Sequence, residues 1–178
     1  MTAPALTVIE CARRFGPEPG LVIADTALRV GAVRRVQLDE QLDRFAGQPG
    51  ALDAAIVVAE ADARAATPLE SISRWRFLCA KLPRPDLQME IDTGVLPLYY
   101  TDFGWKEERT VGEADGIIKY DEEGNVIRAE KIRESRIEDA GYEIARWIWD
   151  EMWNTPDLVV TRVLRTFATA RNRFGLSR

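Results

Sequence analysis

The spacing of hydrophobic residues changes near residue 67. Before it, apolar side chains recur every three to four residues between Gly and Pro breaks, which is typical of amphipathic helices. In the predicted helix 52–65 we expect the buried face to consist of Leu52, Ala55, Ile56 and Ala59. The predicted helices are 7–15, opened by a capping box at Thr7, then 21–30, 36–45 and 52–65.

From residue 67 the pattern predicts a helix followed by strands. Thr67-Pro68-Leu69-Glu70 has the start signals of a helix, and Pro83 ends it. Alternating apolar and polar positions then predict strands. The expected elements are strands at 87–91, 98–105 and 109–115, a loop from 116 with a turn at Gly124-Asn125, a helix at 128–140, a strand at 142–149 and a last helix from 155. This order predicts an α/β domain with a mixed central sheet flanked by helices, preceded by an all-helical segment. We place a domain boundary after residue 66. Residues 1–66 are expected to be a helical connector or partner-binding segment, and residues 67–178 the α/β domain.

Composition is that of an ordinary globular chain. Of 178 residues, 46% are hydrophobic and 30% charged, which is sufficient for a sizeable core. No apolar run approaches the roughly 20 residues of a membrane span, and residues 1–20 lack a signal-peptide core, so we expect a cytoplasmic protein without membrane association. Cys11 and Cys79 lack metal-ligand spacing and are expected to be buried free thiols.

Charge and residue content exclude several functions. The chain has no histidine, which removes Ser-His-Asp and Cys-His catalysis and histidine metal sites. A net charge of −5 argues against a protein that coats nucleic acid by electrostatics alone. The end of the chain is nevertheless basic, and we expect either a solvated face or a phosphate-contacting edge there. Its arginines after Leu158 are Arg162, Arg165, Arg171, Arg173 and Arg178, with no acid among them.

Candidate chemistry is concentrated in the predicted hairpin and just beyond it. Asp102 lies on its first strand, Glu113 and Asp115 on its second, and Lys119 follows. Strand alternation puts Glu113 and Asp115 on the same face. Facing carboxylates repel one another unless a cation bridges them. The hairpin is therefore either a divalent metal site or a solvated polar surface.

The order α-β-β-β-α-β, with one acid on the second strand and an acidic pair on the third, resembles the PD-(D/E)XK, or restriction-endonuclease-like, superfamily. Asp102-Phe103, Glu113-Ala114-Asp115-Gly116 and Lys119 resemble its very-short-patch-repair endonuclease branch. The chain is also similar to the C-terminal part of actinobacterial AbiEi-like proteins, labelled abortive-infection and type IV antitoxin-like. The segments that carry this similarity are TPLESISR (67–74), LPRPDLQ (82–88), DFGW (102–105), GEADGIIKY (112–120), EKIRES (130–135) and AGYEIARW (140–147).

The resemblance implies a nuclease-like domain that uses Mg²⁺ or Mn²⁺, acts on or binds DNA, and serves phage defence or DNA processing. Asp102 and Glu113 would hold the metal, Asp115 would be a further ligand or orient a water, and Lys119 would assist. A helix glutamate, Glu70, would be an outer ligand. The alternative is a catalytically inactive, antitoxin-like module that retains the nuclease fold and binds a protein partner through its helical segment. A homodimer through the same segment is a third option.

Several of these residues also have purely structural explanations. Glu70 would form a capping box with Thr67 and an ion pair with Arg74, and Lys119 would be a solvated loop residue. The basic residues of the 128–140 helix either contact phosphate and support the carboxylates or pair with Glu130 and Glu134; they are Lys131, Arg133 and Arg136. The tryptophans expected in the core, or at its edge to stack on an unpaired base, are Trp105, Trp147 and Trp149.

Overall fold

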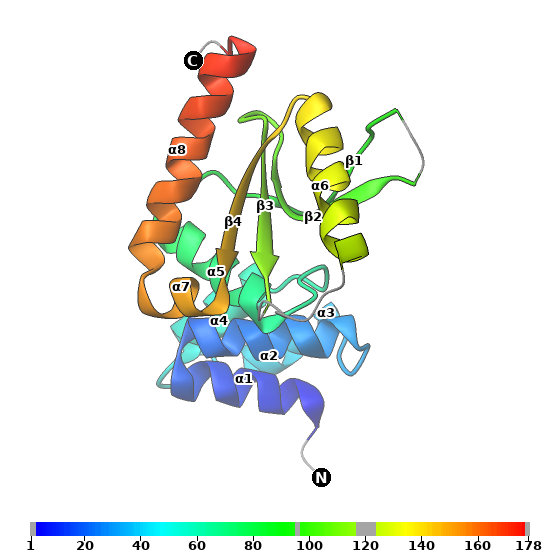
Figure 1. Ribbon diagram of the computed structural model, residues 1–178. Coiled ribbons are helices and arrows are strands. Elements are labelled where there is room, and N and C mark those ends of the chain that lie inside the picture. Colours follow the sequence, from blue (N-terminus) through cyan, green and yellow to red (C-terminus); the bar gives the residue numbers. More distant parts are fainter. Residues whose placement is uncertain (1–2, 95–96, 117–123, 177–178) are drawn as a thin grey trace. The chain divides into compact units, whose positions relative to one another are not determined.

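The computed structural model describes residues 3–94, 97–116 and 124–176, and they form a mixed α/β fold (Figure 1). Internal contacts divide the chain into two compact units, Met1–Arg76 and Phe77–Arg178. The boundary falls within helix α5, Pro68–Cys79. Most of the helix that the sequence assigns to the α/β domain therefore belongs to the first unit.

The first unit is helical, as the spacing of its apolar residues predicts. Its helices before α5 are α1 (Pro4–Phe15), α2 (Pro17–Arg29), α3 (Arg35–Arg44) and α4 (Ala51–Glu60). Helices α1 and α2 run alongside one another (Figure 1). Their inner faces meet those of α3 and α4 in a core that includes Ile9, Leu21, Leu38 and Val57.

Three helix ends in this unit differ from their predictions. Helix α1 begins at Pro4, so Thr7 is inside the helix, where its hydroxyl donates to the carbonyl of Ala3, and the predicted capping box is wrong. Helix α2 begins at Pro17 because Gly16, with φ of 85°, turns the chain directly into it. Helix α4 ends at Glu60 instead of Ala65.

The buried face of α4 is also not the predicted one. Ala54, Val57 and Val58 are buried, whereas Leu52 is 82% exposed and Ile56 is 38% exposed. Nearly every residue of this helix is apolar, so the pattern does not select a face. Just before the helix, Gly50 packs directly on the backbone of Arg13 and leaves no room for a Cβ atom.

The second unit contains a sheet with strand order β1-β2-β3-β4. Strands β1, β2 and β3 are antiparallel neighbours, and β4 pairs with β3 in parallel after a crossover through α6. Helices α6 and α8 approach the sheet from different sides (Figure 1). The bounds are β1 (Asp86–Ile91), β2 (Tyr99–Trp105), β3 (Thr110–Asp115), α6 (Gly124–Asp139), β4 (Glu143–Ile148), α7 (Trp149–Asn154) and α8 (Pro156–Phe174). The α/β class with its mixed sheet is thus as predicted, but the turn at Gly124-Asn125 is wrong, since α6 begins there, and α7 was not predicted.

An aromatic cluster fills one side of this sheet. Phe77 lies edge-on to Trp105 and Trp147, with ring centroids 5.7 and 5.2 Å away. Trp105 and Trp147 are both 1% exposed, as expected for core residues. Trp149 is 41% exposed and stacks on Trp153, so the prediction of a core position for it is wrong. The reason is that β4 ends at Ile148, and strand alternation ends with it.

Neither cysteine forms a disulfide, as predicted, but the prediction of burial is wrong for Cys79, which is exposed at the end of α5; Cys11 is half-buried. Among the described residues, no helix combines the length and apolar character needed to cross a membrane.

Candidate functional site

Glu113 lies near the carboxyl end of β3, on the side of the sheet that faces α6. Its side chain is 8% exposed, and one carboxylate oxygen accepts a hydrogen bond of 2.7 Å from Arg133 of α6. Burial raises the pKa of Glu113 to about 7. The positive charge of Arg133 opposes this rise, and the negative charge of Asp102 adds to it. An acid of this kind changes its ionisation near neutral pH.

Asp102 of β2 lies close to Glu113. The register pairs Phe103 with Gly112, and continuing it by one residue puts Asp102 opposite Glu113. The Asp102 carboxylate accepts the backbone N–H of Ala114 at 2.8 Å, which fixes it against β3. Asp102 and Glu113 are therefore close enough for the charge of Asp102 to raise the pKa of Glu113.

Asp115 ends β3 and faces a second arginine. Its carboxylate lies 3.5 Å from the guanidinium of Arg146 on β4. Burial raises the pKa of Asp115, and the charge of Arg146 acts in the opposite direction. Arg146 also forms ion pairs with Glu130 and, at 3.2 Å, with Glu134 of α6. The Arg146 guanidinium thus forms ion pairs with acids of both β3 and α6.

Arg146 is the part of this cluster that the sequence analysis missed. The parallel register pairs it directly with Glu113, so both side chains face α6. The segment AGYEIARW contains it, but nothing in its composition reveals the register of β4 against β3. Only the pairing of two strands separated by a whole helix brings Arg146 to the acids.

The three basic residues predicted to line α6 lie in different surroundings. Arg133 pairs with Glu113 and, at 3.3 Å, with Glu130. It therefore supports a carboxylate of the predicted site and also forms an ion pair within its own helix, which are the two roles considered for it. Arg136 donates to the hydroxyl of Tyr99 at 2.7 Å. Lys131 is exposed. Of the three, Arg133 is the one with an ion pair to a predicted metal ligand.

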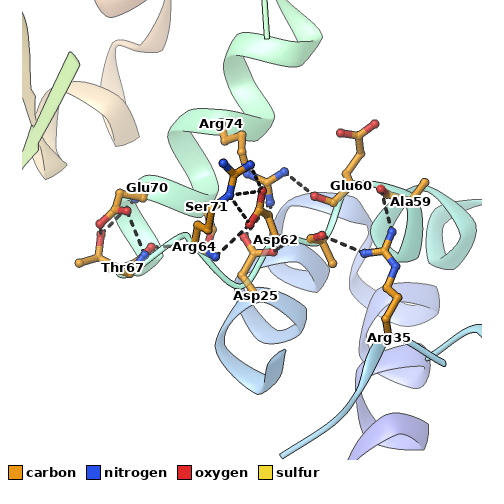
Figure 2. A network of polar contacts seen from close by, with 12 residues as sticks. Asp25, Arg35, Ala59, Glu60, Asp62, Arg64, Thr67, Glu70, Ser71 and Arg74 are labelled. Atoms are coloured by element: carbon orange, nitrogen blue, oxygen red, sulfur yellow. Dashed lines mark hydrogen bonds and ion pairs between the residues drawn. The ribbon is translucent and has the colours of Figure 1, made fainter. Parts of the chain in front are cut away.

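The sequence also predicted site roles for Lys119 and Glu70. Lys119 falls outside the described residues. Glu70 belongs to the first unit, where it is 2% exposed. Its carboxylate accepts hydrogen bonds of 2.9 Å from the hydroxyl of Thr67 and from the backbone N–H of Ala66 (Figure 2). The Thr67 hydroxyl in turn accepts the backbone N–H of Glu70 at 3.2 Å, which is one of the two hydrogen bonds of the expected capping box.

Arg74, the predicted partner of Glu70, forms a buried ion pair with Asp25 of α2. The closest approach is 2.8 Å, and Asp25 also accepts the backbone N–H of Asp62 at 2.7 Å (Figure 2). Arg74 donates as well to the carbonyl of Glu60 at the end of α4. This network connects α2, α4 and α5. These contacts stabilise the packing of the three helices in the first unit.

The basic C-terminal helix has acidic partners from other elements. Arg162 pairs with Glu151 of α7. The remaining pairs are Arg171 with Glu108 and Arg173 with Glu143, each at 2.7 Å. Arg165 is exposed, and Arg178 lies outside the described residues. Three of the five arginines therefore hold the helix to the rest of the second unit.

The donor chemistry of the Asp102 and Glu113 pair is suited to a hard cation. Mg²⁺ and Mn²⁺ prefer carboxylate oxygens, and Mg²⁺ commonly takes one or two of them directly and keeps several waters. Within the described part of the chain, no three His, Cys, Asp or Glu side chains are arranged to hold a metal together. A metal site here would rest on two protein carboxylates from neighbouring strands.

The fold and this cluster define a mixed α/β domain with acids and arginines at the carboxyl ends of two parallel strands. No family model matches the chain, and no solved structure matches it. It is similar to two proteins of Mycobacterium tuberculosis, uncharacterized protein MT2308 of strain CDC 1551 / Oshkosh and uncharacterized protein Rv2248 of strain ATCC 25618 / H37Rv. Each is 28% identical over 170 residues, which cover 96% of this chain and 62% of the relative. The chain thus spans less than two thirds of the length of these curated relatives.

Proposed function

We propose that the second unit is a metal-dependent, nuclease-like domain that binds Mg²⁺ or Mn²⁺ and hydrolyses phosphodiester bonds of DNA, in phage defence or DNA processing. The observation that carries this proposal is the pairing of Asp102 and Glu113. They project from adjacent strands at a place where the Glu113 side chain is only 8% exposed, and the charge of Asp102 helps to raise the pKa of Glu113. Two neighbouring acids that raise one another's pKa are a common feature of functional sites, and a bound cation would neutralise their charges.

In this proposal Asp102 and Glu113 hold the ion. The chemistry that a bound ion supplies is an activated water and charge neutralisation at the phosphoryl oxygens. Asp115, two residues along the same face, is a further ligand or orients the water. Lys119 assists, as the family resemblance implies.

The topology also supports the proposal. The elements α5, β1, β2, β3, α6 and β4 follow the order α-β-β-β-α-β on which the resemblance to restriction-endonuclease-like proteins rests. The acids lie on β2 and β3, at the strand positions that the resemblance assigns to them. Fold alone does not fix activity, so the test has to be chemical.

Cleavage of supercoiled plasmid and of single-stranded DNA in Mn²⁺ or Mg²⁺ tests the proposed activity. The wild-type protein is expected to nick or cut one of these substrates, and Asp102→Ala to lower the rate at least about 100-fold, the scale of losing an essential ligand. Glu138→Ala is the matched control, because it removes an exposed acid of α6 and is expected to leave the rate unchanged. Equal rates for wild type and Asp102→Ala would contradict hydrolysis at this site.

A second candidate function is a catalytically inactive, antitoxin-like or partner-binding module that retains the nuclease fold. The observation in its favour is that arginines already neutralise the acids, Arg133 at Glu113 and Arg146 at Asp115. This candidate predicts no metal uptake by calorimetry and co-purification with a protein partner, whereas the first predicts metal uptake by the isolated chain.

A further inference from the structure

We propose that Arg133 is an internal competitor of the metal ion: its guanidinium occupies the Glu113 carboxylate when no divalent cation is bound and must leave it for one to bind. Arg133 is then a positioning residue that sets the metal affinity of the site. This inference rests on the proposed function, since it concerns the same pair of acids.

The Arg133 guanidinium is held on three sides. One nitrogen donates both to Glu113, at 2.7 Å, and to the backbone carbonyl of Tyr100, at 2.8 Å. Another donates to Glu130 at 3.3 Å. The side chain is 22% exposed, so the guanidinium lies between α6 and the β2–β3 hairpin. An arginine held in this way supplies the buried Glu113 carboxylate with the positive charge that it needs.

A divalent ion would need the same carboxylate. The charge-assisted contact between Arg133 and Glu113 is among the stronger hydrogen bonds in proteins, and an ion at Glu113 would repel the guanidinium at close range. Binding therefore costs the free energy of the Arg133–Glu113 contact. Glu130 lowers that cost, because it already contacts Arg133 and remains its partner after release.

Arg136 provides a matched comparison on the same helix. It carries the same charge three residues further along, but it donates to the neutral hydroxyl of Tyr99. Replacing Arg136 removes one positive charge from α6 without freeing Glu113. Any difference between the two variants therefore measures the specific contact and not the general electrostatic field of the helix.

The experiment is calorimetric titration of Mn²⁺ alone into the metal-free wild-type chain and into Arg133→Gln and Arg136→Gln. The dissociation constant of Arg133→Gln is expected to fall at least tenfold below the wild-type value, and that of Arg136→Gln to stay within threefold of it. A second measurement is the melting temperature. Without metal, Arg133→Gln is expected to melt below wild type, because Glu113 loses its cation, and to gain more than wild type on addition of Mn²⁺.

The outcomes separate this inference from the proposed function. If wild type binds Mn²⁺ and Arg133→Gln binds no more tightly than Arg136→Gln, the competition is refuted while the metal site stands. If neither wild type nor Arg133→Gln binds Mn²⁺, the metal site itself is refuted and the competition with it. Should Arg133→Gln fail to fold, Arg133→Met replaces it: it keeps an extended side chain but removes the charge and the hydrogen-bond donors, and a dissociation constant at or above that of wild type would refute the inference.

Discussion

At the scale of single residues, Glu113 is a buried acid of the second unit. Its carboxyl has a pKa of about 7 in the folded chain because burial and the charge of Asp102 outweigh the attraction of Arg133. Near neutral pH the site therefore changes from a protonated acid to a carboxylate able to accept a cation. A metal that requires the ionised form would bind more tightly as the pH rises through 7.

This pKa makes stability depend on pH with a definite sign. Between the ordinary glutamate value of 4.5 and about 7, folded Glu113 holds a proton that the unfolded chain has lost. The free energy of unfolding therefore decreases as the pH rises through this range, by an amount on the order of 1–3 kcal/mol, and levels off above it. Urea unfolding from pH 4 to 8 measures the effect, and Glu113→Gln, which cannot ionise, is expected to lose this part of the slope. Parallel stability curves for the two proteins would contradict the assignment.

At the scale of elements, the sequence predicts most accurately where one rule acts alone. The predicted hairpin put Asp102 and Glu113 on neighbouring strands, and antiparallel neighbours joined by a short turn leave little freedom in how they pair. The pairing of Arg146 with Glu113 depends instead on a parallel register set by packing across α6, which no local pattern encodes. The orientation of α4 was unpredictable for a related reason, because both of its faces are apolar.

The orientation of α4 can be tested by truncating one residue on each face. Val57 is fully buried and Leu52 is 82% exposed. Val57→Ala is expected to lower the free energy of unfolding by about 1–3 kcal/mol, through lost burial and the cavity left behind. Leu52→Ala removes a larger side chain but is expected to change the free energy by less than about 0.5 kcal/mol. Chemical denaturation measures both, and a larger loss for Leu52→Ala would mean that the face predicted from the sequence is the buried one.

At the scale of the whole molecule, the charge distribution favours binding of a substrate at a local site over binding to a broad basic surface. The net charge is −5, and the arginines at positions 162, 171 and 173 have acidic partners, so bulk electrostatics would attract DNA weakly. The two compact units separate the helical segment from the sheet that carries Asp102 and Glu113. The relatives in Mycobacterium tuberculosis are longer than this chain. A phosphodiester substrate would therefore be held chiefly through the proposed metal and the residues around it.

The most direct test of this account is the binding of Mn²⁺ to the metal-free chain at pH 8, followed by calorimetry in wild type, Asp102→Asn and Glu138→Gln. The account predicts one ion per wild-type chain, at least about tenfold weaker binding in Asp102→Asn, and wild-type binding in Glu138→Gln, where an exposed acid of α6 is neutralised. Equal binding by wild type and Asp102→Asn, or no binding by either wild type or Arg133→Gln, would show that these carboxylates do not hold a metal.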